Sequence, residues 1–223
     1  MSRKKESNQR KKVPAKAQGK TAGGVSPAGR SGTKSGKGSS SSAGIEINEQ
    51  FRKALDLLQN TSKNVFITGK AGTGKSTLLE YFRRNTGKNV VVLAPTGVAA
   101  LNVKGQTIHS FFRFKPDVTL DKVKQIVKNR RKNVYQAADT IVIDEISMVR
   151  ADLLDCVDRF LRLNCLKGND PFGGKQMVFI GDLYQLPPVI KGKERDIFKS
   201  RFDTEYFFSA HSFEGLPMEF ASF

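Results

Sequence analysis

The octapeptide Gly69-Lys70-Ala71-Gly72-Thr73-Gly74-Lys75-Ser76 decides the fold of this 223-residue chain. It fits the pattern G-x-x-x-x-G-K-[ST], in which consecutive backbone N–H groups wrap closely around a phosphate. Such a turn uses positive φ angles and leaves no room for Cβ atoms, which explains its three glycines. An apolar run over 64–68 precedes it, and a helical pattern with Leu78, Leu79 and Phe82 follows. This order of strand, loop and helix predicts a phosphate-binding loop rather than a chance glycine-rich turn.

Three more apolar runs follow, over 90–94, 140–144 and 176–181. They are rich in Val and Ile, are bounded by Gly, Pro or Asn, and show no polar alternation. Strands that are apolar on both faces belong in a parallel sheet covered by helices. Amphipathic helical patterns occupy roughly 49–59 and the stretch that begins near Ala151. We therefore predict a three-layer α/β domain of the P-loop NTPase class, with a mostly parallel sheet, over 45–223.

Net charge is unevenly distributed along the chain. Residues 1–44 carry 11 Lys+Arg and one Glu, or +10 of the total +17. This Gly-, Ser- and Lys-rich segment has no aromatic residue, so it cannot bury enough apolar area to offset the entropy of ordering. We expect a disordered basic tail, which serves either as an arm that touches nucleic-acid phosphates or as a solubilising extension.

Composition excludes several other classes of protein. No stretch approaches the roughly 18 uninterrupted apolar residues of a membrane span, and no apolar segment follows the first charges as in a secretory signal. The two cysteines, Cys156 and Cys165, form neither a disulfide scaffold nor a metal cluster. We expect an intracellular protein without membrane contact, in the cytoplasm or nucleoid of a bacterium or the nucleus or mitochondrion of a eukaryote.

The loop itself supplies the nucleotide-binding candidates. In this pattern Lys75 neutralises the β- and γ-phosphates, and the hydroxyl of Ser76 ligates Mg²⁺. The predicted nucleotide-binding residues are Gly69, Lys70, Ala71, Gly72, Thr73, Gly74, Lys75, Ser76 and Thr77. The expected cofactors are accordingly ATP and Mg²⁺.

Two other expected strands end in polar residues at the same edge of the sheet, where ligands bind in such folds. Asp144 and Glu145 follow one apolar run, so Asp144 is suited to hold Mg²⁺ and Glu145 to polarise the attacking water. Gln185 follows another run and is placed to contact the γ-phosphate, although a loop residue before the Pro-Pro pair would look the same. The expected catalytic residues are Glu145, Lys75 and Gln185.

The class of ATPase depends on the residues between these motifs. The stretches 94–102 (APTGVAALN) and 105–112 (GQTIHSFF) resemble the strand-contacting motifs of superfamily-one DNA helicases. The stretches 144–155 (DEISMVRADLLD), 171–174 (PFGG) and 181–188 (GDLYQLPP) look like the Pif family in particular. This resemblance, over about 45–215, implies a RecA-like first motor domain of a five-prime to three-prime helicase in DNA replication, repair, recombination and telomere maintenance.

The same resemblance places the DNA contacts at Thr96, Thr107 and His109, with single-stranded DNA as the partner. Hydroxyls can bind phosphate oxygens without reading sequence, and His109 offers a stacking surface. The neighbouring Phe111 and Phe112 are better explained as core residues, and Gln50 is a candidate for contact with the adenine base.

A basic run over 122–132 lies on or just after an expected helix whose apolar face is Leu120, Val123, Ile126 and Val127. It suits a DNA backbone, but a solvated helix face explains it equally well.

The family needs a second RecA-like domain, which supplies a transition-state arginine. Only 35 residues follow Pro188, and no motif for that domain occurs among them. The expectation is a truncated first half, or a half completed by another chain, with weak ATPase activity and no unwinding. Two alternatives stay open at this point: a non-catalytic nucleic-acid-binding remnant, and a P-loop ATPase of another remodelling class.

Overall fold

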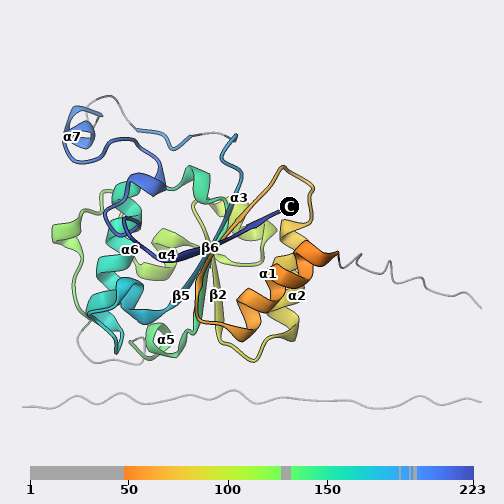
Figure 1. Ribbon diagram of the computed structural model, residues 1–223. Coiled ribbons are helices and arrows are strands. Elements are labelled where there is room, and N and C mark those ends of the chain that lie inside the picture. The colour runs from red at the N-terminus through yellow and green to blue at the C-terminus, as the bar shows by residue number, and fades with distance from the viewer. Residues whose placement is uncertain (1–47, 127–131, 186, 191, 193–194) are drawn as a thin grey trace, which may run out of the picture. The chain divides into compact units, whose positions relative to one another are not determined.

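The computed structural model describes residues 48–126, 132–185, 187–190, 192 and 195–223. The tail predicted over 1–44 lies outside this range. A six-stranded sheet in the order β3-β2-β4-β5-β1-β6 lies at the centre of the described residues, with helices on both faces (Figure 1). Each recorded strand pairing is parallel. The strands are β1 Asn64–Thr68, β2 Val90–Ala94, β3 Gln106–Thr107, β4 Thr140–Ile143, β5 Gln176–Gly181 and β6 Met218–Ser222.

Helix α1 precedes β1, and the other helices lie between successive strands, as a parallel sheet requires. The α-helices are α1 Glu49–Asn60, α2 Lys75–Asn85, α3 Gly97–Asn102, α4 Ile108–Phe112, α5 Lys132–Ala137, α6 Ala151–Asn164 and α7 Arg195–Lys199. Short 3₁₀ turns lie at Leu120–Lys122, Ile146–Met148, Pro171–Gly174 and Phe207–Ser209. No helix among these described segments is long and apolar enough to cross a membrane.

Alternate side chains of the strands enter two separate cores, because successive residues of a strand point to opposite faces. One core lies under α1 and α2 and receives Val65, Ile67, Val142, Val178 and Ile180. The other lies under α4 and α6 and receives Phe66, Ile141, Ile143, Met177 and Phe179. Both faces of the central strands are thus buried, which explains their uninterrupted apolar sequence. Phe111 and Phe112 belong to the second core, as expected.

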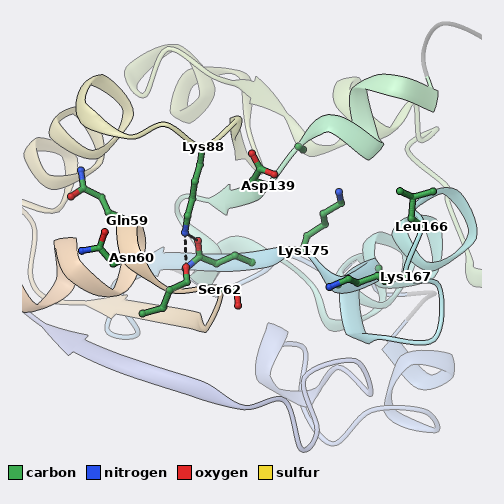
Figure 2. A pocket seen from close by; sticks show the side chains of 13 residues that line it. Gln59, Asn60, Ser62, Lys88, Asp139, Leu166, Lys167 and Lys175 are labelled. Atoms are coloured by element: carbon green, nitrogen blue, oxygen red, sulfur yellow. Dashed lines mark hydrogen bonds between the residues drawn. The ribbon is translucent and has the colours of Figure 1, made fainter.

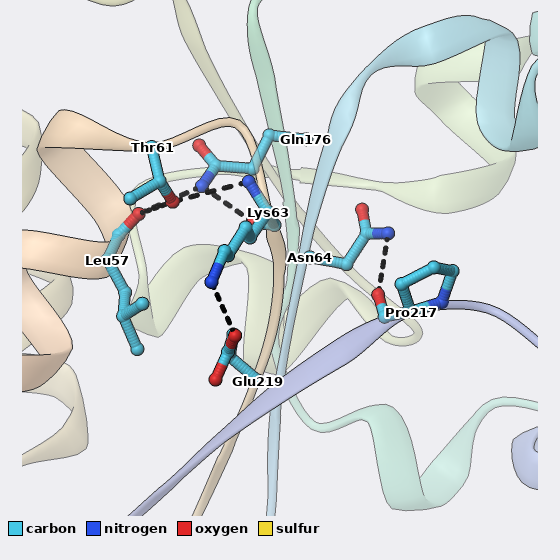
Figure 3. Close-up of polar contacts among 7 residues, drawn as sticks. All are labelled: Leu57, Thr61, Lys63, Asn64, Gln176, Pro217 and Glu219. Atoms are coloured by element: carbon cyan, nitrogen blue, oxygen red, sulfur yellow. Dashed lines mark hydrogen bonds and ion pairs between the residues drawn. The ribbon is translucent and has the colours of Figure 1, made fainter.

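A polar cluster closes the amino-terminal edge of the sheet. Gln176 donates from its side-chain amide to the carbonyl oxygens of Leu57 and Lys63, and Lys63 pairs with Glu219 at 2.7 Å (Figure 3). The Lys88 ammonium donates to the side-chain oxygen of Gln176 at 2.8 Å, beside a cavity of about 470 Å³ (Figure 2). Burial lowers the pKa of Lys88, and the charge of Asp139 partly offsets this. The cluster joins the end of α1 to β5 and β6.

The prediction of a helix around 120–127 is wrong for the residues of this segment that the structure describes. Only the 3₁₀ turn Leu120–Lys122 is helical there, and no helix continues through Ile126. Asn164 of α6 is the cause, since its side-chain oxygen accepts from the Ile126 backbone N–H at 2.7 Å and its amide donates to the Lys124 carbonyl at 3.4 Å. These contacts take backbone groups that a helix would use. Much of the basic run, 127–131, lies outside the described residues.

Candidate functional site: a nucleotide cavity and an adjoining strand edge

The phosphate-binding loop follows β1 and ends at Gly74, the N-terminal cap of α2. Gly69, Gly72 and Gly74 have φ angles of 149°, 81° and 100°, a region that favours glycine. A Cβ at Gly69 would also lie 2.5 Å from the Phe223 carbonyl oxygen, so any larger residue would displace the end of β6. The loop is therefore shaped as its glycine pattern predicts.

Lys75 folds back over this loop. Its ammonium donates to the carbonyl oxygens of Gly69 at 2.6 Å and Lys70 at 2.7 Å. The hydroxyl of Thr73 also donates to the Lys70 carbonyl, at 2.9 Å. The positive charge thus lies inside the loop, where a bound phosphate would meet it.

A cavity of about 280 Å³ joins the polar residues at the carboxyl ends of three strands. Parallel strands present these ends at a single edge, so residues distant in sequence meet there. Its lining residues include Lys75, Ser76, Asp144, Glu145 and Gln185, together with Ala71, Gly72, Gly74, Thr77, Gly181 and Asp182. The structure therefore brings the expected metal and catalytic residues together with six of the nine expected nucleotide-binding residues. Gly69, Lys70 and Thr73 belong to the loop but do not line the cavity. The chemical roles of all these residues stay predictions.

Asp144 and Glu145 leave β4 in an unusual conformation. Glu145 has φ 52° and ψ 44°, in the left-handed region that non-glycine residues seldom adopt. This turn directs the chain into the 3₁₀ turn Ile146–Met148. Burial, together with the adjacent Glu145 charge, raises the pKa of Asp144 to about 6, against the opposing effects of a hydrogen bond from the Glu145 backbone and of the Lys75 charge. A nearby cation would stabilise the charged form of such a carboxylate.

Sequence reasoning assigned no role to Asp182, which the structure places in the cavity and buries to 7% exposure. Its carboxylate accepts from the Tyr184 backbone N–H at 3.0 Å and from the Gln185 side-chain amide at 3.5 Å. Asp182 thereby orients Gln185. Its position directly after the strand that ends at Gly181 was the available signal.

Two predicted DNA contacts cap neighbouring helices at the same edge. The Thr96 hydroxyl accepts from the Ala99 N–H at 3.2 Å at the start of α3, and Thr107 accepts from Ser110 N–H at 3.1 Å at the start of α4. Thr96 follows β2, and Thr107 is the last residue of the adjacent strand β3. Each hydroxyl keeps its proton for a further acceptor, such as a phosphate oxygen.

His109, the third predicted contact, is the second residue of α4 and lines a cavity of about 700 Å³. His211, the other histidine of the chain, lines the same cavity. Burial lowers the pKa of His109, so the neutral imidazole is favoured there. Gln50 is exposed in the first turn of α1 and is absent from the residues that line the nucleotide cavity.

Comparison with known proteins identifies the family. The yeast ATP-dependent DNA helicase PIF1 of Saccharomyces cerevisiae is 44% identical over 161 residues, which are 68% of this chain and 18% of the yeast protein. The Pif1 helicase of Psychrobacter is 43% identical over 142 residues, or 61% of this chain and 21% of its own length. The chain thus spans about a fifth of the length of these relatives.

Solved structures agree with the sequences. The Pif1 helicase from Bacteroides, in complex with ADP-AlF3 and single-stranded DNA, matches with a TM-score of 0.71 and 40% identity, over 79% of this chain and 42% of that chain. The expected RecA-like P-loop fold is confirmed. The family model for PIF1-like helicases matches residues 46–215, which are more than half of the sequence. The chain therefore belongs to the PIF1-like helicase family.

Proposed function

We propose that this chain is the first RecA-like motor domain of an ATP-dependent DNA helicase. The observation that carries the proposal is the single cavity that joins the phosphate-binding loop to Asp144, Glu145 and Gln185. A simple phosphate-binding turn does not need this set of residues. Hydrolysis of a nucleoside triphosphate needs all of them. The enzyme must neutralise the charge of the phosphates, orient the attacking water molecule and contact the terminal phosphate.

Each residue has a role in this proposal. Lys75 exchanges its loop carbonyls for the β- and γ-phosphates of ATP. Glu145 orients the water that attacks the γ-phosphorus, and the bond to the oxygen bridging to the β-phosphorus breaks. Gln185, positioned by Asp182, contacts the γ-phosphate and changes its contacts when that phosphate leaves. The backbone N–H groups of the loop hold the remaining phosphates.

The residues also fit Mg²⁺. The Ser76 hydroxyl and the Asp144 carboxylate line one cavity, and oxygen ligands of this kind suit this cation. The raised pKa of Asp144 shows that its charge is poorly compensated by the protein alone. We assign Ser76 and Asp144 to hold the ion, which when bound would neutralise charge that develops on the phosphates.

Single-stranded DNA is the proposed second ligand. Thr96 and Thr107 present hydroxyls from two neighbouring helix starts, and His109 lies on the second of these helices. Helix N-termini favour phosphate groups, and such contacts do not depend on sequence. The Bacteroides relative was solved with single-stranded DNA, which supports the assignment.

Unwinding is proposed for the assembly rather than for these residues alone. It needs a second RecA-like domain that closes on the nucleotide, in the same protein or on another chain. With that domain, we propose five-prime to three-prime movement in replication, recombination, repair or telomere maintenance. For the 223-residue chain alone we expect weak ATP hydrolysis without unwinding.

Substitution of Lys75→Ala separates a working site from a remnant. We expect loss of binding of a fluorescent ATP analogue, while the affinity for a fluorescent dT oligonucleotide stays within about twofold. A variant that binds both ligands as the wild type does would overturn the proposal. Lys53→Ala, which removes an exposed lysine of α1 outside the loop, is the matched control.

A further inference from the structure

Helix α3 presents two large aliphatic side chains to solvent. Val98 is 72% exposed and Leu101 is 80% exposed, whereas Ala100 on the opposite side of the helix is only 5% exposed. Their spacing of three places them next to each other on one face. Exposed apolar residues that occur singly are ordinary, whereas these two are adjacent and lie beside a groove lined by cations.

A groove of about 400 Å³ lies beside this face, between α2 and the end of α3. Its lining includes Arg83 and Arg84 from α2, Asn102 at the end of α3, and Val103 and Lys104 directly after α3. Asn102 lies close to Val98 around the helix, so the exposed pair and the groove are continuous. We name Val98, Leu101 and this groove the α2–α3 surface.

Positive charge dominates the α2–α3 surface. Glu80, the acidic residue among those that line the groove, is shared by Arg84 at 2.6 Å and Lys104 at 3.5 Å. Arg83 donates to the Val103 carbonyl at 2.7 Å, which holds its guanidinium at the groove wall. Three cations against one carboxylate leave two positive charges in excess. The side chains of Arg84 and Lys104 are 72% and 75% exposed, so these charges face solvent.

We propose that the α2–α3 surface is a docking site for an acidic amphipathic helix of a partner protein. Aliphatic side chains next to cations match a segment that carries Leu or Phe on one face and Asp or Glu beside it. Arginine is suited to such a segment because its planar group binds carboxylates through two hydrogen bonds.

A DNA strand fits this surface less well. Sequence-independent binding of unpaired bases uses aromatic or arginine planes for stacking. Val98 and Leu101 offer no such plane. The two arginine groups are already engaged, Arg83 with the Val103 carbonyl and Arg84 with Glu80. None of the predicted DNA contacts lines the groove. Peptide docking goes beyond the proposed motor function. Ser76 and Thr77 at the start of α2 line both the groove and the nucleotide cavity, but the docking residues Leu101, Arg84 and Lys104 do not line that cavity.

The test uses a fluorescein-labelled amphipathic peptide of about 16 residues, long enough for four helical turns. Its apolar face carries Leu and its polar face Glu, and a second peptide replaces each Glu with Lys. We expect the 223-residue chain to bind the Glu peptide more tightly, by about tenfold or more, with weaker binding at higher salt. Absence of binding to the Glu peptide, or equal affinity for both, would overturn the proposal.

Variants then locate the site on the surface. Leu101→Ser should weaken binding of the Glu peptide about fivefold, and the double change Arg84→Glu with Lys104→Glu about tenfold or more. Leu166→Ser is the control, since Leu166 is 85% exposed and lies outside the α2–α3 surface. Binding of the fluorescent ATP analogue should not change in these variants. Failure of the docking proposal can therefore be distinguished from failure of the motor assignment. Unaltered peptide binding in all variants, or displacement of the peptide by an equimolar dT oligonucleotide, would contradict the assignment.

Discussion

The Lys75 ammonium donates a 2.6 Å hydrogen bond to the carbonyl oxygen of Gly69, at the opposite end of the phosphate-binding loop. With its second bond to Lys70, this contact holds the loop in its curved form before any phosphate is bound. The lysine is therefore preorganised at the centre of the site. Binding of a phosphate exchanges carbonyl acceptors for anionic ones, which form stronger hydrogen bonds with an ammonium.

This geometry predicts that charge alone does not suffice at position 75. Lys75→Arg keeps the positive charge but places a larger planar group where a compact ammonium fits between two carbonyls. We expect the affinity for a fluorescent ATP analogue to fall about tenfold or more. If Lys75→Arg bound the ATP analogue as tightly as the wild type in a fluorescence titration, the loop carbonyls would not define the site.

Asp144 predicts a pH-dependent stability. Its pKa of about 6, against the ordinary 3.8, means that the folded chain binds the proton more tightly than the unfolded chain. The resulting stabilisation is fully present below about pH 3.8 and is lost as pH rises through about 6. Above that pH the charged carboxylate costs about 3 kcal/mol at most, since one pKa unit corresponds to about 1.4 kcal/mol.

The variant Asp144→Asn removes this titration. Without Mg²⁺ or nucleotide, we expect its free energy of unfolding to rise relative to the wild type by up to about 3 kcal/mol between about pH 4 and about pH 7. Urea unfolding at several pH values measures this difference. A difference that stays constant with pH would mean that Asp144 is not destabilised by burial.

Thr96 caps α3 and is also a proposed DNA contact, and substitutions can separate the two. Thr96→Ala loses the cap of α3 and should cost about 1 kcal/mol of stability. Thr96→Asp keeps a capping oxygen but adds negative charge where a DNA phosphate is expected, so stability should hold while affinity for a dT oligonucleotide falls about tenfold. Urea unfolding and fluorescence anisotropy report the two effects. DNA affinity that survives in the Asp variant would remove Thr96 from the DNA contacts.

Lys88 is predicted to stabilise the fold from the edge opposite the nucleotide cavity. Its ammonium donates to the carbonyl oxygens of Leu58 and Thr61 and to the side chain of Gln176. Lys88→Met leaves these acceptors without their donor and should lower the free energy of unfolding by about 2 kcal/mol. Lys53→Met, at an exposed helical ion pair with Glu49, should change it by less than about 0.5 kcal/mol. Similar losses in both variants would contradict the role given to Lys88.

Sequence patterns predicted the strands that are buried on both faces. Strands β1, β2, β4 and β5 lie inside the sheet, and their side chains enter apolar surroundings on both faces, so each appears as an apolar run. The cavity residues were also predictable, because the ends of parallel strands share an edge. The sequence shows each of these residues directly after an apolar run, and that order is enough to predict that they meet.

Other elements depend on contacts that no local pattern contains. Strand β3 has only two residues, and the edge strand β6 is partly exposed, with Phe220 71% exposed, so neither forms an apolar run. The periodicity around Val123 resembled a helix, but Asn164 binds the backbone of that segment instead. The role of Asp182 toward Gln185 required the geometry of the turn after β5.

The most direct test of the motor assignment is the rate of ATP hydrolysis by the 223-residue chain, with and without a dT oligonucleotide. Glu145→Gln is the matched control, because it keeps the size of the side chain and removes the carboxylate that we propose orients water. We expect slow hydrolysis with Mg²⁺ that the oligonucleotide increases and that Glu145→Gln abolishes. Hydrolysis that is equal in the wild type and in Glu145→Gln, or that never responds to DNA, would contradict the account.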